Sequence, residues 1–174
     1  MRERFGSAAA PPLLLLVFVV GACSTRVPLP GAKPPPTFHL TELSSQGDPE
    51  RRASHRLLLE GLRHDEAGQR SLARNQYRLA IQLDPGNPYA YLAFARHLAE
   101  GRDPARALPY LDKLDGLLAI ERAPQGVEAH RVGLRGAALR ATGDTDAAAP
   151  LLMRARELAP ELWSDAHLSA SELR

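Results

Sequence analysis

The side chains best suited to chemistry in this sequence are its single cysteine and its six histidines. No two histidines stand three or four residues apart, so none are paired on one helix face as metal ligands would be. The sequence does not contain GxxxxGK[ST], HExxH or GxSxG. These patterns are typical of nucleotide phosphate binding, zinc-dependent proteolysis and acyl transfer, respectively. We therefore expect no catalytic residue, metal site, cofactor or small-molecule substrate.

Two acidic clusters are the remaining candidates for catalysis or metal binding. His64, Asp65 and Glu66 come just before Gly68, where a helix is expected to end, so we interpret them as a solvated helix terminus. Asp144 and Asp146 precede an expected helix and are interpreted as capping residues.

The cysteine follows an apolar run that is too short to cross a membrane. Residues 13–20 are all apolar and would form about 12 Å of helix, against a bilayer core of about 30 Å. Basic residues before the run and small residues after it are typical of a secretion signal. The segment Val20-Gly21-Ala22-Cys23 resembles the lipobox of bacterial lipoproteins, although that family usually has Leu where Val20 stands.

The lipobox resemblance implies where in the cell the protein is located. Residues 1–22 would be a cleaved signal peptide, and the Cys23 thiol would carry lipid that anchors the protein to a membrane. Ser24 stands where Asp commonly signals inner-membrane retention, which favours the outer membrane with the domain facing the periplasm. Ordinary signal cleavage nearby, or a cytosolic protein with a spurious hydrophobic start, remain the alternatives.

Residues 23–48 are expected to form a disordered tether. Five prolines lie in this stretch, and a sixth follows directly at position 49. Apolar residues recur there with neither strand nor helix periodicity. A semi-extended chain of this kind spans at most roughly 80 Å.

The rest of the chain, residues 49–174, predicts an all-α domain. Aromatic residues make up only 5% of the sequence, and the single cysteine excludes an internal disulfide, so helix packing must supply the stability. Asp48-Pro49, Asn87-Pro88 and Asp103-Pro104 each place a capping residue before a proline suited to the first helical position.

The helices recur as similar pairs. The segment from Gly68 to Pro85 and the segment from Gly143 to Pro160 carry small and apolar residues at the same spacings. The pattern resembles the tetratricopeptide repeat, a helix-turn-helix unit with small residues where helices cross. The resemblance implies a short solenoid with repeats at about 53–87, 88–128 and 129–162 and a C-terminal capping helix at 163–174, in which Trp163 anchors the cap.

The same resemblance implies a concave partner-binding face formed by the first helix of each pair. The residues assigned to partner contact are Tyr89, Leu92, Arg96, His130 and Arg140. Tyr and Arg are frequent at interfaces because they offer a large contact area and can pair with carboxylates.

Nucleic acid is an improbable partner. Removing residues 1–22 takes away two arginines and one glutamate, which leaves 20 basic and 19 acidic residues and no basic block. We expect a noncatalytic, envelope-anchored adaptor or scaffold that binds a protein or peptide, as in assembly of a pilus or secretion system. The alternative is a noncatalytic accessory subunit of a peptidoglycan-processing or proteolytic enzyme complex.

Overall fold

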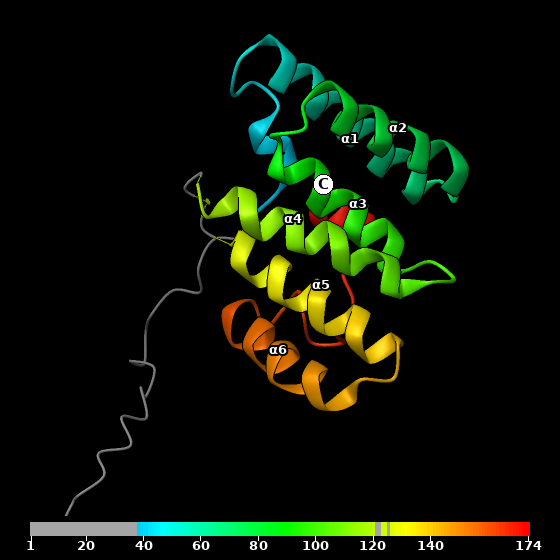
Figure 1. Cartoon of the computed structure of the whole chain (residues 1–174), viewed down its shortest axis with the longest axis vertical. Helices are drawn as coiled ribbons and strands as arrows, with labels where there is room; N and C mark the ends of the chain where they lie inside the picture. The colour runs from blue at the N-terminus through cyan, green and yellow to red at the C-terminus, as the bar shows by residue number, and fades with distance from the viewer. Residues whose placement is uncertain (1–37, 121–122, 125) are drawn as a thin grey trace, which may run out of the picture. The chain divides into compact units, whose positions relative to one another are not determined.

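The computed structural model describes residues 38–174 except 121, 122 and 125, and these residues form an all-helical unit (Figure 1). The absence of strands from the described part of the chain agrees with the all-α prediction. The elements are η1 (Leu40–Leu43), α1 (Pro49–Glu66), α2 (Arg70–Leu83), α3 (Pro88–Ala99), η2 (Pro104–Ala107), α4 (Leu108–Leu118), α5 (Val127–Ala141), α6 (Thr145–Leu158) and α7 (Ala170–Leu173).

Local capping signals determine where several helices begin. The Asp48 carboxylate accepts a hydrogen bond from the Arg51 backbone N–H at 2.7 Å, and Asn87 caps α3 in the same way. Asp144 caps α6, which confirms its interpretation as a capping residue. At Asp103 the outcome differs, because residues 104–107 form a 3-10 turn and the α-helix starts only at Leu108. Pro109 then lies in the first turn, where its missing N–H costs little.

Two turn glycines allow the chain to reverse between the helices of a pair. Gly68, between α1 and α2, has a φ of +71°, and Gly143, between α5 and α6, has a φ of +92°. Both angles lie in the left-handed region, which glycine adopts without steric cost. The helices form three successive pairs: α1 packs on α2, α3 on α4, and α5 on α6.

Helix α3 is the centre of the unit. It contacts both helices of the first pair as well as α4, α5 and α7. Residues 88–98 are buried all the way round the helix, as expected for a helix with neighbours on every side. The core therefore runs continuously through all three pairs.

Small residues lie where the helices approach one another, as the sequence predicts. A Cβ atom added at Gly61 in α1 would meet the Tyr77 ring of α2 at 2.5 Å, and one added at Gly136 in α5 would meet Leu152 of α6 at 2.8 Å. The alanines at the corresponding positions are also buried: Ala73, Ala80, Ala95, Ala107, Ala148 and Ala155. Larger side chains at these points would push the helices apart.

The close contact at Gly61 gives a first testable prediction. We expect Gly61→Ala to destabilise the protein by about 1–3 kcal/mol, because the new methyl group overpacks against Tyr77. Gly116→Ala in α4 is the matched control, since no atom lies within 4 Å of its added Cβ. That change should stabilise the protein by about 0.5–1 kcal/mol through helix propensity. Urea unfolding of both variants checks the prediction, and equal effects would contradict it.

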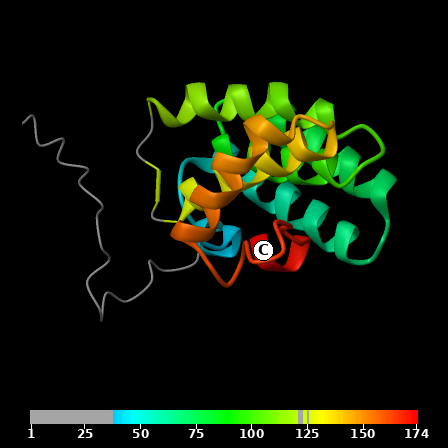
Figure 2. The same cartoon turned by 90° about the horizontal axis from the view of Figure 1, so that it is seen from below.

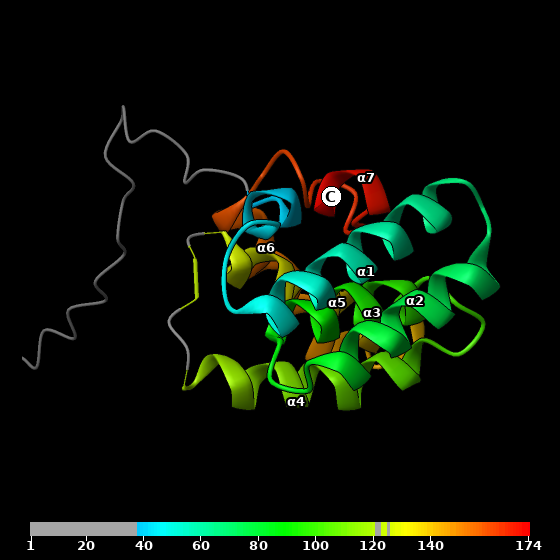
Figure 3. The same cartoon turned by 90° about the horizontal axis from the view of Figure 1, so that it is seen from above.

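The ends of the described chain lie together on one side of the pairs. Figures 2 and 3 show η1 and α7 on the side of the unit opposite to α4. Both elements contact α1, and α7 also contacts α3. The first helices α1, α3 and α5 are therefore covered by segments from the two ends of the unit.

This arrangement corrects one boundary and the position of the capping helix, both expected from the sequence. The folded unit begins before the expected boundary at 48/49, because Phe38, Leu40 and Leu43 are buried in the core. The segment expected to cap the last helix pair does place Trp163 against α5. Its helix α7, however, packs on α1 and α3, so the segment crosses to the first pair instead of covering the end of the last one. Residues 23–37 of the expected tether lie outside the described residues.

Candidate functional site

The residues expected to contact a partner share one surface of the first helices, which we call the first-helix face. Its members are Tyr89, Leu92 and Arg96 on α3 and His130 and Arg140 on α5. The structure brings them together on the side that faces η1 and the C-terminal segment 159–174. Tyr89, Leu92, Arg96 and His130 are buried, and Arg140 is exposed. The expected open concave surface is thus filled by the chain itself, and the role of these five residues in partner contact stays a prediction.

Residues 38–43, which we call the N-terminal segment, cover one part of the first-helix face through ring contacts and hydrogen bonds. The Phe38 ring packs at 5.6 Å from the Tyr89 ring and at 6.2 Å from the His130 ring. Nε2 of His130 lies 3.1 Å from the Phe38 carbonyl oxygen, and Nδ1 of His55 lies 2.7 Å from that of Leu43. Two buried histidines therefore attach this segment by its backbone.

The C-terminal segment covers the neighbouring part of the same face. The Trp163 ring is fully buried over Gly133 of α5, where any side chain would collide with the ring. Further along, Arg140 donates a hydrogen bond to the Ala166 carbonyl oxygen at 3.1 Å, and Leu168 and Leu173 are buried. A capping box between Ser169 and Glu172 starts the short helix α7.

The two covering segments also meet each other. The backbone N–H of Thr41 donates to the Arg174 carbonyl oxygen at 3.0 Å. The Arg174 guanidinium pairs with Glu66 of α1 at 2.7 Å. The two segments therefore form one joined layer over the buried part of the first-helix face.

Beneath this layer lies a buried ionic cluster that links α1, α2 and α3. Asp65 pairs with Arg96, and both side chains are almost completely buried, at 2% and 1% exposed. The Asp65 carboxylate also accepts hydrogen bonds from the Tyr77 hydroxyl at 2.9 Å and from Nδ1 of His97 at 2.8 Å. Arg96 makes a second ion pair with Glu100 at 2.8 Å.

The cluster holds Asp65 in its charged form. Burial alone would raise the pKa of Asp65, but the His97 hydrogen bond and the charge of Arg96 outweigh it and hold that pKa below its usual value. Burial and the charge of Asp65 raise the pKa of Tyr77, although Arg96 opposes this shift. A permanently paired, water-excluded carboxylate positions helices and offers no exposed acid or base.

The sequence interpretation of this region was wrong for Asp65. The His64-Asp65-Glu66 segment was expected to be a solvated terminus, yet the Asp65 side chain is buried and makes three polar contacts with α2 and α3. The partners lie up to 32 residues further along the chain. No local pattern around Asp65 indicates them, although a charged Arg96 within the apolar stretch 88–98 is itself a signal that a buried counter-charge is needed.

Metal ligation finds no support in the described part of the chain. No group of three or more His, Cys, Asp or Glu side chains there could hold a metal ion. Cys23, the expected lipidation site, lies outside the described residues. Among the helices that the structure describes, none is long and apolar enough to cross a membrane.

Because His130 is buried, we expect the protein to lose stability as the pH falls below neutral. Burial lowers the pKa of His130 to about 4, despite the opposing hydrogen bond to Phe38, with smaller contributions from His39, which lowers the pKa, and Glu172, which raises it. In the unfolded chain the same group titrates near 6.5. Between pH 4 and pH 6.5 the unfolded state therefore binds more protons at His130 than the folded state does. The free energy of unfolding that neutral His130 contributes is present above pH 6.5 and decreases as the pH falls towards 4.

We expect His130 alone to remove about 2 kcal/mol of unfolding free energy between pH 7 and pH 5. Urea unfolding at the two pH values measures the loss. His130→Gln should reduce the difference between the two pH values by that amount, even if the variant is less stable at both. An unchanged pH dependence in His130→Gln would contradict the assignment.

Neither a family model, nor a curated protein, nor a solved structure is similar enough to count as a match. The function must therefore be argued from the residues and their arrangement.

Proposed function

We propose that this chain is a noncatalytic, tetratricopeptide-like lipoprotein of the bacterial envelope that recruits a protein partner to a membrane-anchored complex. The observation that carries the proposal is the succession of three helix pairs with small residues buried at equivalent crossing points. Stacked pairs of this kind present extended surfaces to partners and need no reactive centre. The motif Val20-Gly21-Ala22-Cys23 supplies the anchor, and the outer membrane facing the periplasm is the proposed location.

The surface proposed for the partner lies around Arg140, the one exposed member of the first-helix face. A pocket there is lined by residues of α3, α5 and the C-terminal segment, among them Glu100, Ala137, Arg140 and His167. Arg140 is exposed, and its guanidinium, held by the Ala166 carbonyl, is placed to pair with a carboxylate of a partner. His167 and Glu100, which also line the pocket, form an ion pair at 3.0 Å when His167 is protonated. Of the buried members of the face, Arg96 lines the pocket as well.

Site-directed photo-crosslinking in cells tests the recruitment. A photo-crosslinking amino acid at position 167, which lines the pocket and leaves Arg140 in place, should give a discrete adduct with one envelope protein. The same amino acid at position 153 is the control, because Met153 on α6 is 59% exposed and does not line the pocket. No adduct from position 167, or the same adducts from both positions, would contradict the proposed surface.

Metabolic labelling with a fatty-acid analogue tests the anchor separately. The wild-type chain should take up the label, and Cys23→Ala should lose it and leave the membrane fraction. Absence of label from the wild type would contradict the lipoprotein assignment, whatever the crosslinking shows.

A further inference from the structure

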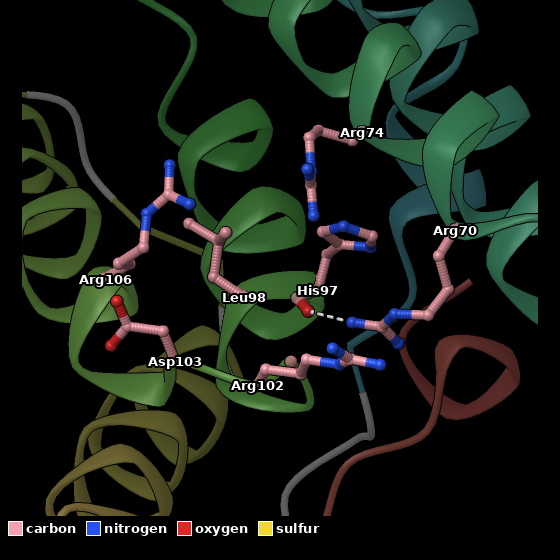
Figure 4. A pocket seen from close by; sticks show the side chains of 8 residues that line it. Arg70, Arg74, His97, Leu98, Arg102, Asp103 and Arg106 are labelled. Carbon is pink, nitrogen blue, oxygen red and sulfur yellow. Dashed lines mark hydrogen bonds between the residues drawn. The ribbon is translucent and has the colours of Figure 1, made fainter.

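A second pocket, which shares no lining residue with the first, is rich in arginine. The pocket is formed by α2, the end of α3 and the turn that leads into α4. Its lining residues are Arg70, Arg74, His97, Leu98, Gly101, Arg102, Asp103 and Arg106. Figure 4 shows the guanidinium groups of Arg70 and Arg74 on either side of the His97 ring, with that of Arg102 next to Arg70.

Most of these arginines have no counter-charge. Arg70 donates a hydrogen bond to the His97 carbonyl oxygen at 2.8 Å and lies 3.8 Å from a Glu100 carboxylate oxygen. Within the described residues, no ion pair is made by Arg74, Arg102 or Arg106. Arg131 and Arg135 of α5, by contrast, are partly buried, and each pairs with Asp115.

The imidazole of His97 forms part of the pocket wall between Arg70 and Arg74. His97 is fully buried, and its Nδ1 donates to Asp65. Its Nε2 has no hydrogen-bond partner among the residues that the structure describes. Because the Nδ1 proton is directed to Asp65, Nε2 donates to an anion only in a protonated ring, so the arginines supply the positive charge of the site.

The charges indicate what kind of ligand fits. Arg70 is balanced in part by Glu100, so the unpaired charges are three guanidinium groups and the carboxylate of Asp103. A surplus of two positive charges matches a dianion. Guanidinium groups bind phosphate and carboxylate oxygens in bidentate fashion, and a phosphate monoester presents three oxygens for several guanidinium groups at once. A single carboxylate would leave most of the arginines unpaired.

We propose that the pocket between α2, α3 and the α3–α4 turn binds a phosphate monoester or free phosphate as a dianion. The Arg74 and Arg102 guanidinium groups contact the oxygens from two sides, and Arg70 and His97 complete the inner wall. This site is separate from the pocket proposed for the protein partner, and the two proposals are tested independently.

Calorimetric titration of the full chain in a neutral detergent tests the site. Inorganic phosphate and glycerol 3-phosphate, at pH 8 and constant ionic strength, are expected to bind saturably, whereas added chloride gives no binding heat. Arg74→Ala combined with Arg102→Ala should weaken binding at least tenfold. Arg78→Ala is the matched control, because it removes an exposed arginine one turn further along α2 that does not line the pocket.

A titration with a short-chain phospholipid distinguishes a free phosphate monoester from a membrane headgroup. Dioctanoyl phosphatidylglycerol carries a singly charged phosphodiester and should bind more weakly than glycerol 3-phosphate. Tighter binding of the lipid would overturn the monoester in favour of a membrane headgroup. Equal binding by wild type and by the Arg74/Arg102 double variant, or heats no larger than those of chloride, would overturn the site altogether.

Discussion

Asp65→Ala is expected to lower the free energy of unfolding by about 3–5 kcal/mol. The substitution removes the carboxylate that pairs with Arg96 and leaves that guanidinium 1% exposed with Glu100 as its remaining ion-pair partner. It also removes the acceptor of the Tyr77 hydroxyl and of Nδ1 of His97. Buried donors without acceptors add their own desolvation cost. Urea unfolding followed by circular dichroism measures the change.

A surface ion pair provides the control for Asp65. Arg154 and Glu157 on α6 pair at 3.0 Å, but both side chains are 56% exposed. Glu157→Ala should therefore cost no more than about 1 kcal/mol. A similar small cost for Asp65→Ala would show that the buried cluster does not hold α1 to α3.

Trp163→Ala is the second large effect, with an expected loss of about 3–5 kcal/mol. The indole is the largest fully buried side chain among the described residues, and it packs directly over Gly133. Its removal leaves a cavity between α5 and the C-terminal segment. Because that segment continues into α7, the contacts of Leu168 and Leu173 should weaken as well.

A double-mutant cycle with Gly133→Ala isolates this contact. A Cβ atom at Gly133 would lie within 2.5 Å of three indole atoms, so Gly133→Ala alone should cost about 1–3 kcal/mol. In the Trp163→Ala background the new methyl group enters the cavity, and its cost should largely disappear. Additive losses would contradict direct contact between the two residues. Met153→Ala, at an exposed position of α6, should change stability by no more than about 0.5 kcal/mol.

Features that depend on neighbouring residues could be predicted from the sequence. Asp48, Asn87 and Asp144 act as caps because their side chains bond to backbone groups two or three residues away. The small residues at helix crossings follow from a regular spacing within each pair. These signals are sufficient to predict that the described part of the chain consists of helices, which pack as three pairs.

Features that depend on distant residues could not be predicted in the same way. His130 bonds to the carbonyl of Phe38 across 92 residues, and Arg174 pairs with Glu66 across 108. Leu40 and Leu43 belong to η1, which at four residues is too short to give a periodic pattern in the sequence, and Phe38 lies before it. The sequence therefore indicated which residues form the face but not that the chain covers it.

Coverage of the first-helix face by the chain's own ends is the claim on which the partner surface depends. Trp163 is the only tryptophan in the chain, so its fluorescence reports on the C-terminal segment alone. Acrylamide quenching of the full chain should be several-fold weaker in buffer than in urea, with emission shifted to the blue, because the indole is fully buried against α5. Emission and quenching in buffer equal to those of the unfolded chain would show that the segment is off the face and would contradict the account.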